Sequence, residues 1–290
     1  MVTRKWRAFI LLLAALALAA CGSVSRLAYL NAPPLATWYI GSYVDLTDAQ
    51  KKFVKERLKQ AMAWHREAEL PRYQHAIEDL IGKTNVKLSL EDTRAIYGQA
   101  RDYYHRSLDH LLPDIAEFLL MLSEEQIAQA ERKLASDSKK MVKESIDGTP
   151  DERRTRRTKR FVDQFEEWTG PLSPPQREII VSGTRSLADT TDDRLGDRKY
   201  RQAELVQLLR ARAPRDQVAA TLRKLFIDTD SWRRPEYLKR LRERDERLFE
   251  VTSELSATLT PEQRAHVQRK MRGYVNDISS IIASGTDGRG

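Results

Sequence analysis

Cys21 is the only cysteine of the chain, and of all its side chains the thiol of Cys21 is the best suited to forming a covalent bond as a nucleophile. A thiolate is a strong nucleophile. Cys21 directly follows Leu18, Ala19 and Ala20, whose small alanine side chains suit the binding groove of a peptidase. Upstream, a basic start is followed by an uncharged run over residues 8–17, which is the pattern of a signal peptide. We therefore expect cleavage after residue 20 and modification of Cys21.

The sequence Leu18-Ala19-Ala20-Cys21 resembles the lipobox of bacterial lipoproteins. The resemblance implies acyl groups such as palmitate on Cys21 and no other cofactor. Gly22 stands where an Asp would retain such a lipoprotein at the inner membrane, so the resemblance points to the outer membrane and its periplasmic face. Two alternatives remain, a secretory signal with an incidental Cys and a transmembrane helix, although the apolar run is short for a span of about 20 residues.

No other residues form a recognisable catalytic or metal-binding motif. The five histidines form no His-Glu-x-x-His pair and there is no Gly-x-Ser-x-Gly elbow, so we expect neither a catalytic nor a metal site. Four glutamates could act as acids, but a sugar-cleaving pair is defined by separation in space, and solvated helix faces also explain them. These residues are Glu67, Glu69, Glu166 and Glu167.

One segment of the chain is strongly basic and is the expected contact for an anionic partner. The partner would be a lipid headgroup, lipopolysaccharide or an acidic protein, and the alternative is a solvated helix face. Nucleic acid is not expected, because residues 1–20 direct the chain to the envelope. A second basic stretch, residues 233–247, is interleaved with acids that form i, i+4 pairs. The basic segment consists of Arg153, Arg154, Arg156, Arg157, Lys159 and Arg160.

The rest of the chain predicts an all-α protein. Of its 290 residues 41% are hydrophobic and only 12 are Gly, and apolar residues recur at 3- and 4-residue steps. Without residues 1–20 the formal net charge falls from +8 to +5. We expect helices over residues 47–68, 71–82, 90–111, 114–121, 123–145, 151–168, 174–190, 198–212, 214–227, 234–257 and 261–283. They would form a multi-helix bundle or an elongated helical array on an N-terminal lipid tether.

The domain organisation follows from the same pattern. Residues 1–20 are the signal peptide, 21–46 an aromatic-rich tether, 47–284 the helical domain and 285–290 a disordered tail. A division of the helical domain into two lobes would fall near 146–175, where Pro, Gly and Thr interrupt the helical pattern. The tether's rings could pack on the body or rest at the membrane interface, and we favour the body.

A five-residue motif, Leu-[Ser/Thr]-x-x-Gln, occurs at residues 46–50, 122–126, 172–176 and 259–263. Average residue usage predicts far fewer than one occurrence. The motif predicts a capping box, in which the hydroxyl accepts from the N3 amide and Gln reaches back to the cap N–H. It is similar to the repeated Leu-Thr-x-x-Gln of the Spy/CpxP-type periplasmic proteins, which protect unfolded clients or sense envelope stress. The alternative, which we favour, is that a helical protein reuses a good N-cap.

A more specific resemblance lies at the start of the mature chain, in residues 26–40, 43–47, 63–66 and 69–73. With the lipobox, they resemble an uncharacterised proteobacterial lipoprotein family, a domain of unknown function. The resemblance implies no catalytic residues. We expect a non-enzymatic, outer-membrane-anchored periplasmic lipoprotein that binds another envelope component as a chaperone-like or scaffold module. The alternative is a cell-wall or glycolipid-modifying enzyme using a buried Glu.

Overall fold

The computed structural model describes residues 22–284, and these confirm the expected all-α class because no strand occurs among them. The predicted signal peptide (residues 1–20), Cys21 and residues 285–290 lie outside the described residues. The elements are α2 (Gly22–Leu30), α3 (Ala32–Gly41), α4 (Asp48–Trp64), the π-helical η1 (His65–Glu69), α5 (Leu70–Lys83), α6 (Leu90–Leu120), α7 (Glu124–Met141), the π-helical η2 (Val142–Ile146), α8 (Pro150–Thr169), α9 (Pro174–Arg185), α10 (Thr191–Arg210), α11 (Arg215–Phe226), the 3-10 turn η3 (Thr229–Ser231), α12 (Pro235–Ala257) and α13 (Pro261–Ser284).

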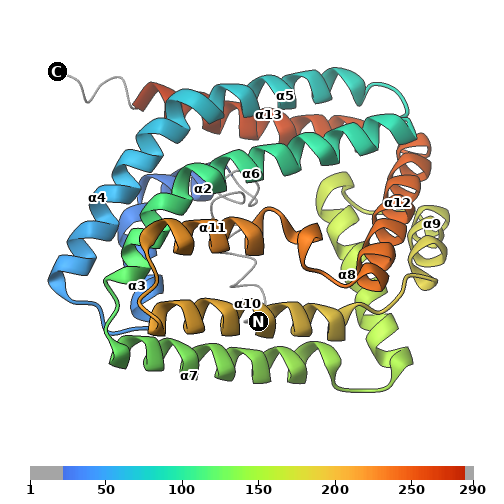
Figure 1. Cartoon of the computed structure of the whole chain (residues 1–290). Helices are drawn as coiled ribbons and strands as arrows, with labels where there is room; N and C mark the ends of the chain where they lie inside the picture. The colour runs from blue at the N-terminus through green and yellow to red at the C-terminus, as the bar shows by residue number, and fades with distance from the viewer. Residues whose placement is uncertain (1–21, 285–290) are drawn as a thin grey trace.

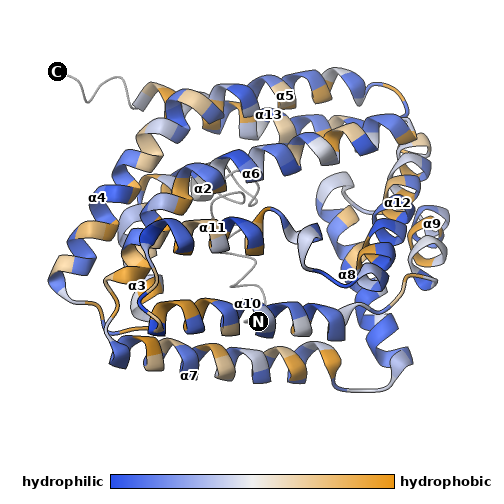
Figure 2. Ribbon diagram, viewed as in Figure 1, coloured by the Kyte–Doolittle hydropathy of each residue, from blue (hydrophilic) through white to orange (hydrophobic). Residues whose placement is uncertain are grey.

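The helices form an open array with several small cores. In Figure 1, α5 and α13 run along one long side, α7 and α10 along the other, and α4 and α12 close the two ends. Buried residues gather in four separate clusters, one each around Tyr29, Leu112, Val44 and Val162. Figure 2 shows that α3 is mostly hydrophobic, unlike the longer, mixed helices around it.

The four Leu-[Ser/Thr]-x-x-Gln motifs all form the expected capping boxes. Thr47, Ser123 and Ser173 accept from the backbone N–H of the Gln three residues later, and that Gln accepts from the cap N–H. Thr260 and Gln263 make the same two bonds at 3.2 and 3.0 Å. Each motif therefore begins a helix, as the sequence predicts.

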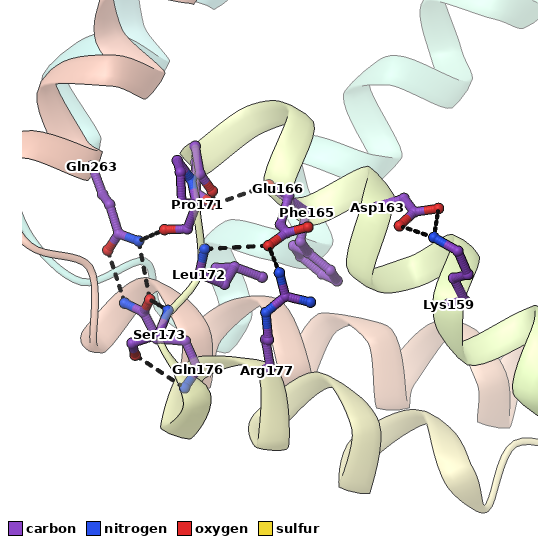
Figure 3. Close-up of polar contacts among 12 residues, drawn as sticks. Lys159, Asp163, Phe165, Glu166, Pro171, Leu172, Ser173, Gln176, Arg177 and Gln263 are labelled. Atoms are coloured by element: carbon purple, nitrogen blue, oxygen red, sulfur yellow. Dashed lines mark hydrogen bonds and ion pairs between the residues drawn. The ribbon is translucent and has the colours of Figure 1, made fainter.

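The glutamines of the motifs also pair across the fold. Gln50 and Gln126 donate to each other's Oε1 at 2.9 and 2.8 Å, and each amide also donates to the carbonyl just before the partner's motif leucine, at Met121 and Asp45. Gln176 and Gln263 repeat the arrangement, with the carbonyls of Thr258 and Pro171 as acceptors. Figure 3 shows this amide pair and the bond from Gln263 to Pro171.

These two amide pairs join the start of α4 to that of α7 and the start of α9 to that of α13. The oxygen of each Gln side chain accepts two hydrogen bonds and its NH₂ group donates two, so every donor and acceptor site of the amide is occupied.

Several helix boundaries differ from the predicted ones. The break expected between residues 111 and 114 is wrong: α6 runs unbroken through Pro113. Pro113 is exposed, whereas Leu112 and Ala116 are buried against α11, so packing holds the helix together despite the lost N–H. The predicted helix at 174–190 ends at Arg185, and the one expected from residue 198 begins at Thr191.

Residues 22–41, treated above as a tether, form α2 and α3. Tyr29 is buried with Met62, Leu70 and Ile278 and donates its hydroxyl to the Met62 carbonyl at 3.2 Å. Tyr43 donates to Asp137 Oδ2 at 2.7 Å. These two rings pack on the body, whereas Trp38 is 69% exposed.

Gly183 lies where α9 meets α12, and a Cβ there would overlap Val251 Cγ2. We expect Gly183→Ala to lower the free energy of unfolding by about 1 to 2 kcal/mol, since overpacking outweighs the gain in helix propensity. Urea denaturation measures the change. The matched control is Gly196→Ala on α10, which meets open space and should gain up to about 1 kcal/mol. Equal effects of the two substitutions would contradict the close approach at Gly183.

Candidate functional site

An apolar cavity of about 380 Å³ opens between α8, α12 and the loop joining α5 to α6. We call it the α8–α12 groove. Its volume is within the range of ligand-binding clefts. Its apolar walls are Phe161, Phe165 and Trp168 of α8, Leu248 and Leu255 of α12, and Val86, Leu88, Leu259 and Val267.

The wall on α8 follows from local sequence. Thr149 caps α8 in a box with Glu152, and Pro150 occupies the first turn. Phe161, Phe165 and Trp168 then follow at steps of four and three, on one helix face. The adjacent Val162 is buried with Ile180 and Val251, so the core below fixes the orientation of this face.

The opposite wall is a loop that Arg264 holds in place. The Arg264 guanidinium donates to the carbonyls of Thr84, Val86 and Ser256 at 3.2, 2.9 and 2.7 Å. Ser256 Oγ accepts from the Leu88 N–H at 3.0 Å, and Ser253 donates to the Leu88 carbonyl at 2.8 Å. The loop is therefore bonded in position, which makes the groove a pre-formed feature.

The chemistry of the groove is that of binding. The residues lining it include no carboxylate, histidine or cysteine, and Arg264 is the only charged group among them. Lys270 lies beside it, with its ammonium 4.8 Å from the centre of the Trp168 ring. The lining therefore offers apolar contact next to positive charge and no group for acid–base catalysis.

The basic segment lies on α8 and mostly bonds to nearby groups of the protein. Arg153 and Arg157 lie 3.3 and 3.7 Å from Asp189, and Lys159 pairs with Asp163 at 2.8 Å (Figure 3). Arg154 pairs with Asp151, and Arg156 donates to the Asp147 carbonyl at 2.5 Å.

Arg160 is the exception within the basic segment. It is exposed, and the described residues supply it with no ion pair or hydrogen bond. It stands one turn before Gln164, which lines the groove. The structure therefore leaves one uncompensated cation of the segment near the groove.

Of the four glutamates considered from sequence, only Glu69 is buried. Its side chain, at the end of η1, is 3% exposed and lies 3.0 Å from Arg106. Neither described cavity is lined by Glu69. Glu166 accepts from Arg177 and Glu167 from Lys270, so these two serve ion pairs (Figure 3 shows the first).

His65, one turn before Glu69, lies in an aromatic cluster. Its Nδ1 is 3.3 Å from the Tyr29 hydroxyl, and its Nε2 is buried with no hydrogen-bond partner. Burial lowers the pKa of His65 to about 4 and raises that of Tyr29 to about 12. His65 is therefore neutral at neutral pH, with the proton on Nδ1, since Tyr29 donates to Met62.

The groove could not be predicted from the sequence. Phe161, Phe165 and Trp168 have the spacing of an apolar helix face, but nothing in that spacing distinguishes a groove wall from a core contact. Val86 and Leu88 were missed, and their only signal is two apolar residues in a short loop after Gly82. Cys21 and residues 18–20 lie outside the described residues.

Within residues 22–284, no helix combines the length and apolar character needed to cross a membrane. Over the same residues, no three His, Cys, Asp or Glu side chains gather closely enough to hold a metal ion.

Comparison with known proteins gives a family match. The model of a family of unknown function (DUF6279) matches residues 42–238, which include α8 and the basic segment. This confirms the resemblance to an uncharacterised family. No curated protein and no solved structure matches the chain, so the likeness to the Spy/CpxP-type proteins stays an expectation from the capping motif alone.

Proposed function

We propose that this chain, which belongs to the family of unknown function DUF6279, is a non-enzymatic lipoprotein that binds an envelope protein through the α8–α12 groove. Acyl groups on Cys21 hold it at the periplasmic face of the outer membrane. The observation that carries the proposal is the groove, which is apolar, pre-formed and open to solvent. The lipobox and signal peptide supply the location.

The openness of the groove favours a protein partner. A small ligand site buries most of its ligand. Here Val86, on the groove wall, is itself 66% exposed, so a free acyl chain would stay in partial contact with water. One or two apolar side chains projecting from a larger surface fit better, because the partner itself then covers the opening.

Charge narrows the class of partner further. Arg160 stands next to the aromatic wall of α8 and has no ion pair among the described residues, and Arg264 lies in the opposite wall. Lys270 also lies beside Trp168 but is paired with Glu167. A segment of the partner that carries an apolar side chain with Asp or Glu residues beside it would fill the groove and place its acids near these cations. Complementary charges at a rim mainly accelerate association and select partners.

Site-specific photocrosslinking in intact cells tests the proposal. With a photoreactive residue in place of Val86, we expect a discrete crosslinked protein of the envelope. The matched control places the same residue at Tyr200 on α10, another exposed apolar side chain, which does not line the groove. Arg160→Glu should weaken the Val86 product several-fold.

Three outcomes would overturn the proposal: the same products from both positions, no product from Val86, or lipid as its only product. In the same cells Cys21→Ser is expected to release the protein from the membrane fraction. Retention of that variant would refute the anchor while leaving the groove result intact.

A further inference from the structure

The exposed face of α2 and α3 carries an unusual concentration of large apolar side chains. Leu27 is 65% exposed, Leu30 43%, Leu35 39% and Trp38 69%. These four are half of the large hydrophobic residues that are exposed within the described part of the chain. They lie within twelve successive residues, with Leu27 and Leu30 one turn apart on α2 and Leu35 and Trp38 one turn apart on α3.

The opposite face of the same helices is fixed to the body. Tyr29, Ala32 and Ala36 are buried, and Tyr29 is bonded to the Met62 carbonyl. α2 packs on α13, and α3 packs on α4. The helices therefore cannot turn to bury Leu27 and Trp38 without breaking this packing. Leaving so much apolar surface in water is unfavourable, and contiguous exposed patches usually mark a contact surface.

The position of the patch in the chain identifies its occupant. α2 begins at Gly22, the residue after Cys21. Acyl chains on Cys21 would hold that residue at the level of the lipid headgroups. Leu27 is five residues into α2, about 8 Å along the helix. The patch therefore starts within one headgroup layer of the anchor, and Trp38 supplies the amphipathic ring that is favoured at such interfaces.

Charge near the patch agrees with a lipid surface. A second cavity, of about 560 Å³, lies beside Trp38 and is also lined by Pro34, Lys51 and Lys55. Lys51 pairs with Asp48 at 3.0 Å, but Lys55 is exposed and the described residues give it no ion pair. Arg26 is exposed on α2. Each such cation near an anionic membrane adds attraction for lipid phosphates.

We infer that this face of α2 and α3, with Leu27, Leu30, Leu35 and Trp38, contacts the phospholipid surface and fixes the orientation of the body on the membrane. The inference rests on the proposed anchor at Cys21. The acyl chains and this face attach the body to the membrane at two places, so the body keeps one orientation and does not rotate freely about a single anchor. The α8–α12 groove, built from other helices, then keeps a constant orientation toward the periplasm.

The lone cysteine allows a direct test. Residues 21–290 are coupled through the Cys21 thiol to a maleimide phospholipid in vesicles of phosphatidylethanolamine and phosphatidylglycerol. Brominated lipids then quench any Trp at the surface. We expect quenching in the wild-type protein and its loss in Trp38→Phe. Leu27→Asn should reduce the membrane-contacting population about tenfold, because it removes one large apolar contact.

The control is Val86→Asn, which changes a side chain of equal exposure outside the patch and should leave quenching unchanged. Unquenched Trp38 in the wild-type protein, or equal effects of Leu27→Asn and Val86→Asn, overturns the inference. A dimer in solution that Leu27→Asn converts to a monomer also overturns it, in favour of a second copy as occupant. The maleimide attaches the lipid whether or not the cell acylates Cys21, so this experiment tests the membrane contact alone. Natural acylation is tested separately, by measuring the mass of the native protein.

Discussion

Gln50→Ala is expected to lower the free energy of unfolding by about 3 to 4 kcal/mol. The substitution removes four hydrogen bonds at once: those to the Thr47 N–H and the Met121 carbonyl, and both bonds with Gln126. A single bond contributes about 1 kcal/mol, and buried groups left without a partner add to the loss. Chemical denaturation followed by circular dichroism measures the difference.

The control for this prediction is a capping box with no partner across the fold. Ser89 and Asp92 form such a box at the start of α6, and outside the box Asp92 bonds, among residues 22–284, only to Lys83. Asp92→Ala should therefore cost only about 1 kcal/mol, the usual value for a lost cap interaction.

A double-mutant cycle completes the test. Gln126→Ala should cost about as much as Gln50→Ala, and the double mutant far less than the sum, because both single changes break the same amide pair. Additive effects, or a Gln50→Ala loss no larger than that of Asp92→Ala, would show that the paired amides contribute nothing beyond capping.

Acidification from pH 6.5 to 4 is expected to destabilise the protein by up to about 3 kcal/mol through His65. Burial lowers the pKa of His65 to about 4, below its ordinary 6.5, so the unfolded chain binds the proton more tightly. The contribution of the neutral ring to the free energy of unfolding is fully present above pH 6.5 and is lost as the pH falls toward 4. The groups facing the ring are Tyr29, Trp64 and Tyr73, and the charge of Arg66 acts on the Tyr29 hydroxyl.

Unfolding free energies measured across this pH range check the prediction. His65→Asn, which keeps an N–H donor near the place of Nδ1 but does not titrate, should flatten the pH dependence by about the same amount. His75→Asn is the control, because His75 is 77% exposed and pairs with Asp79 on the surface. An unchanged pH profile in His65→Asn would assign the acid sensitivity to carboxylates instead.

The sequence predicts local features of this fold well and the contacts between distant segments poorly. Ser or Thr followed by Gln three residues later is a complete local signal, so all four boxes were predictable. Their pairing was not, because nothing in Gln50 or its neighbours points to Gln126. At Pro113 the local signal predicted a helix break that does not occur. The burial of Leu112 and Ala116 against α11 keeps α6 continuous there.

The candidate surfaces divide in the same way. The sequence alone could not decide whether the N-terminal aromatic rings pack on the body or face the membrane. Tyr29 and Trp38 both lie in helical segments, and which side of its helix faces the body depends on the placement of the other helices. The groove needs α8, α12 and the loop around Val86, which are distant in sequence. Its apolar residues therefore look like ordinary core residues until the helices are placed.

The two amide pairs have a consequence for the order of folding. One of the four side-chain bonds of each Gln, that to the cap N–H, closes within four residues and can form as soon as a helix starts. The other three join segments 71 to 92 residues apart and must wait until chain loops of that length have closed. Early nuclei can therefore be capped but not paired, and the paired amides belong to the last part of the structure to assemble.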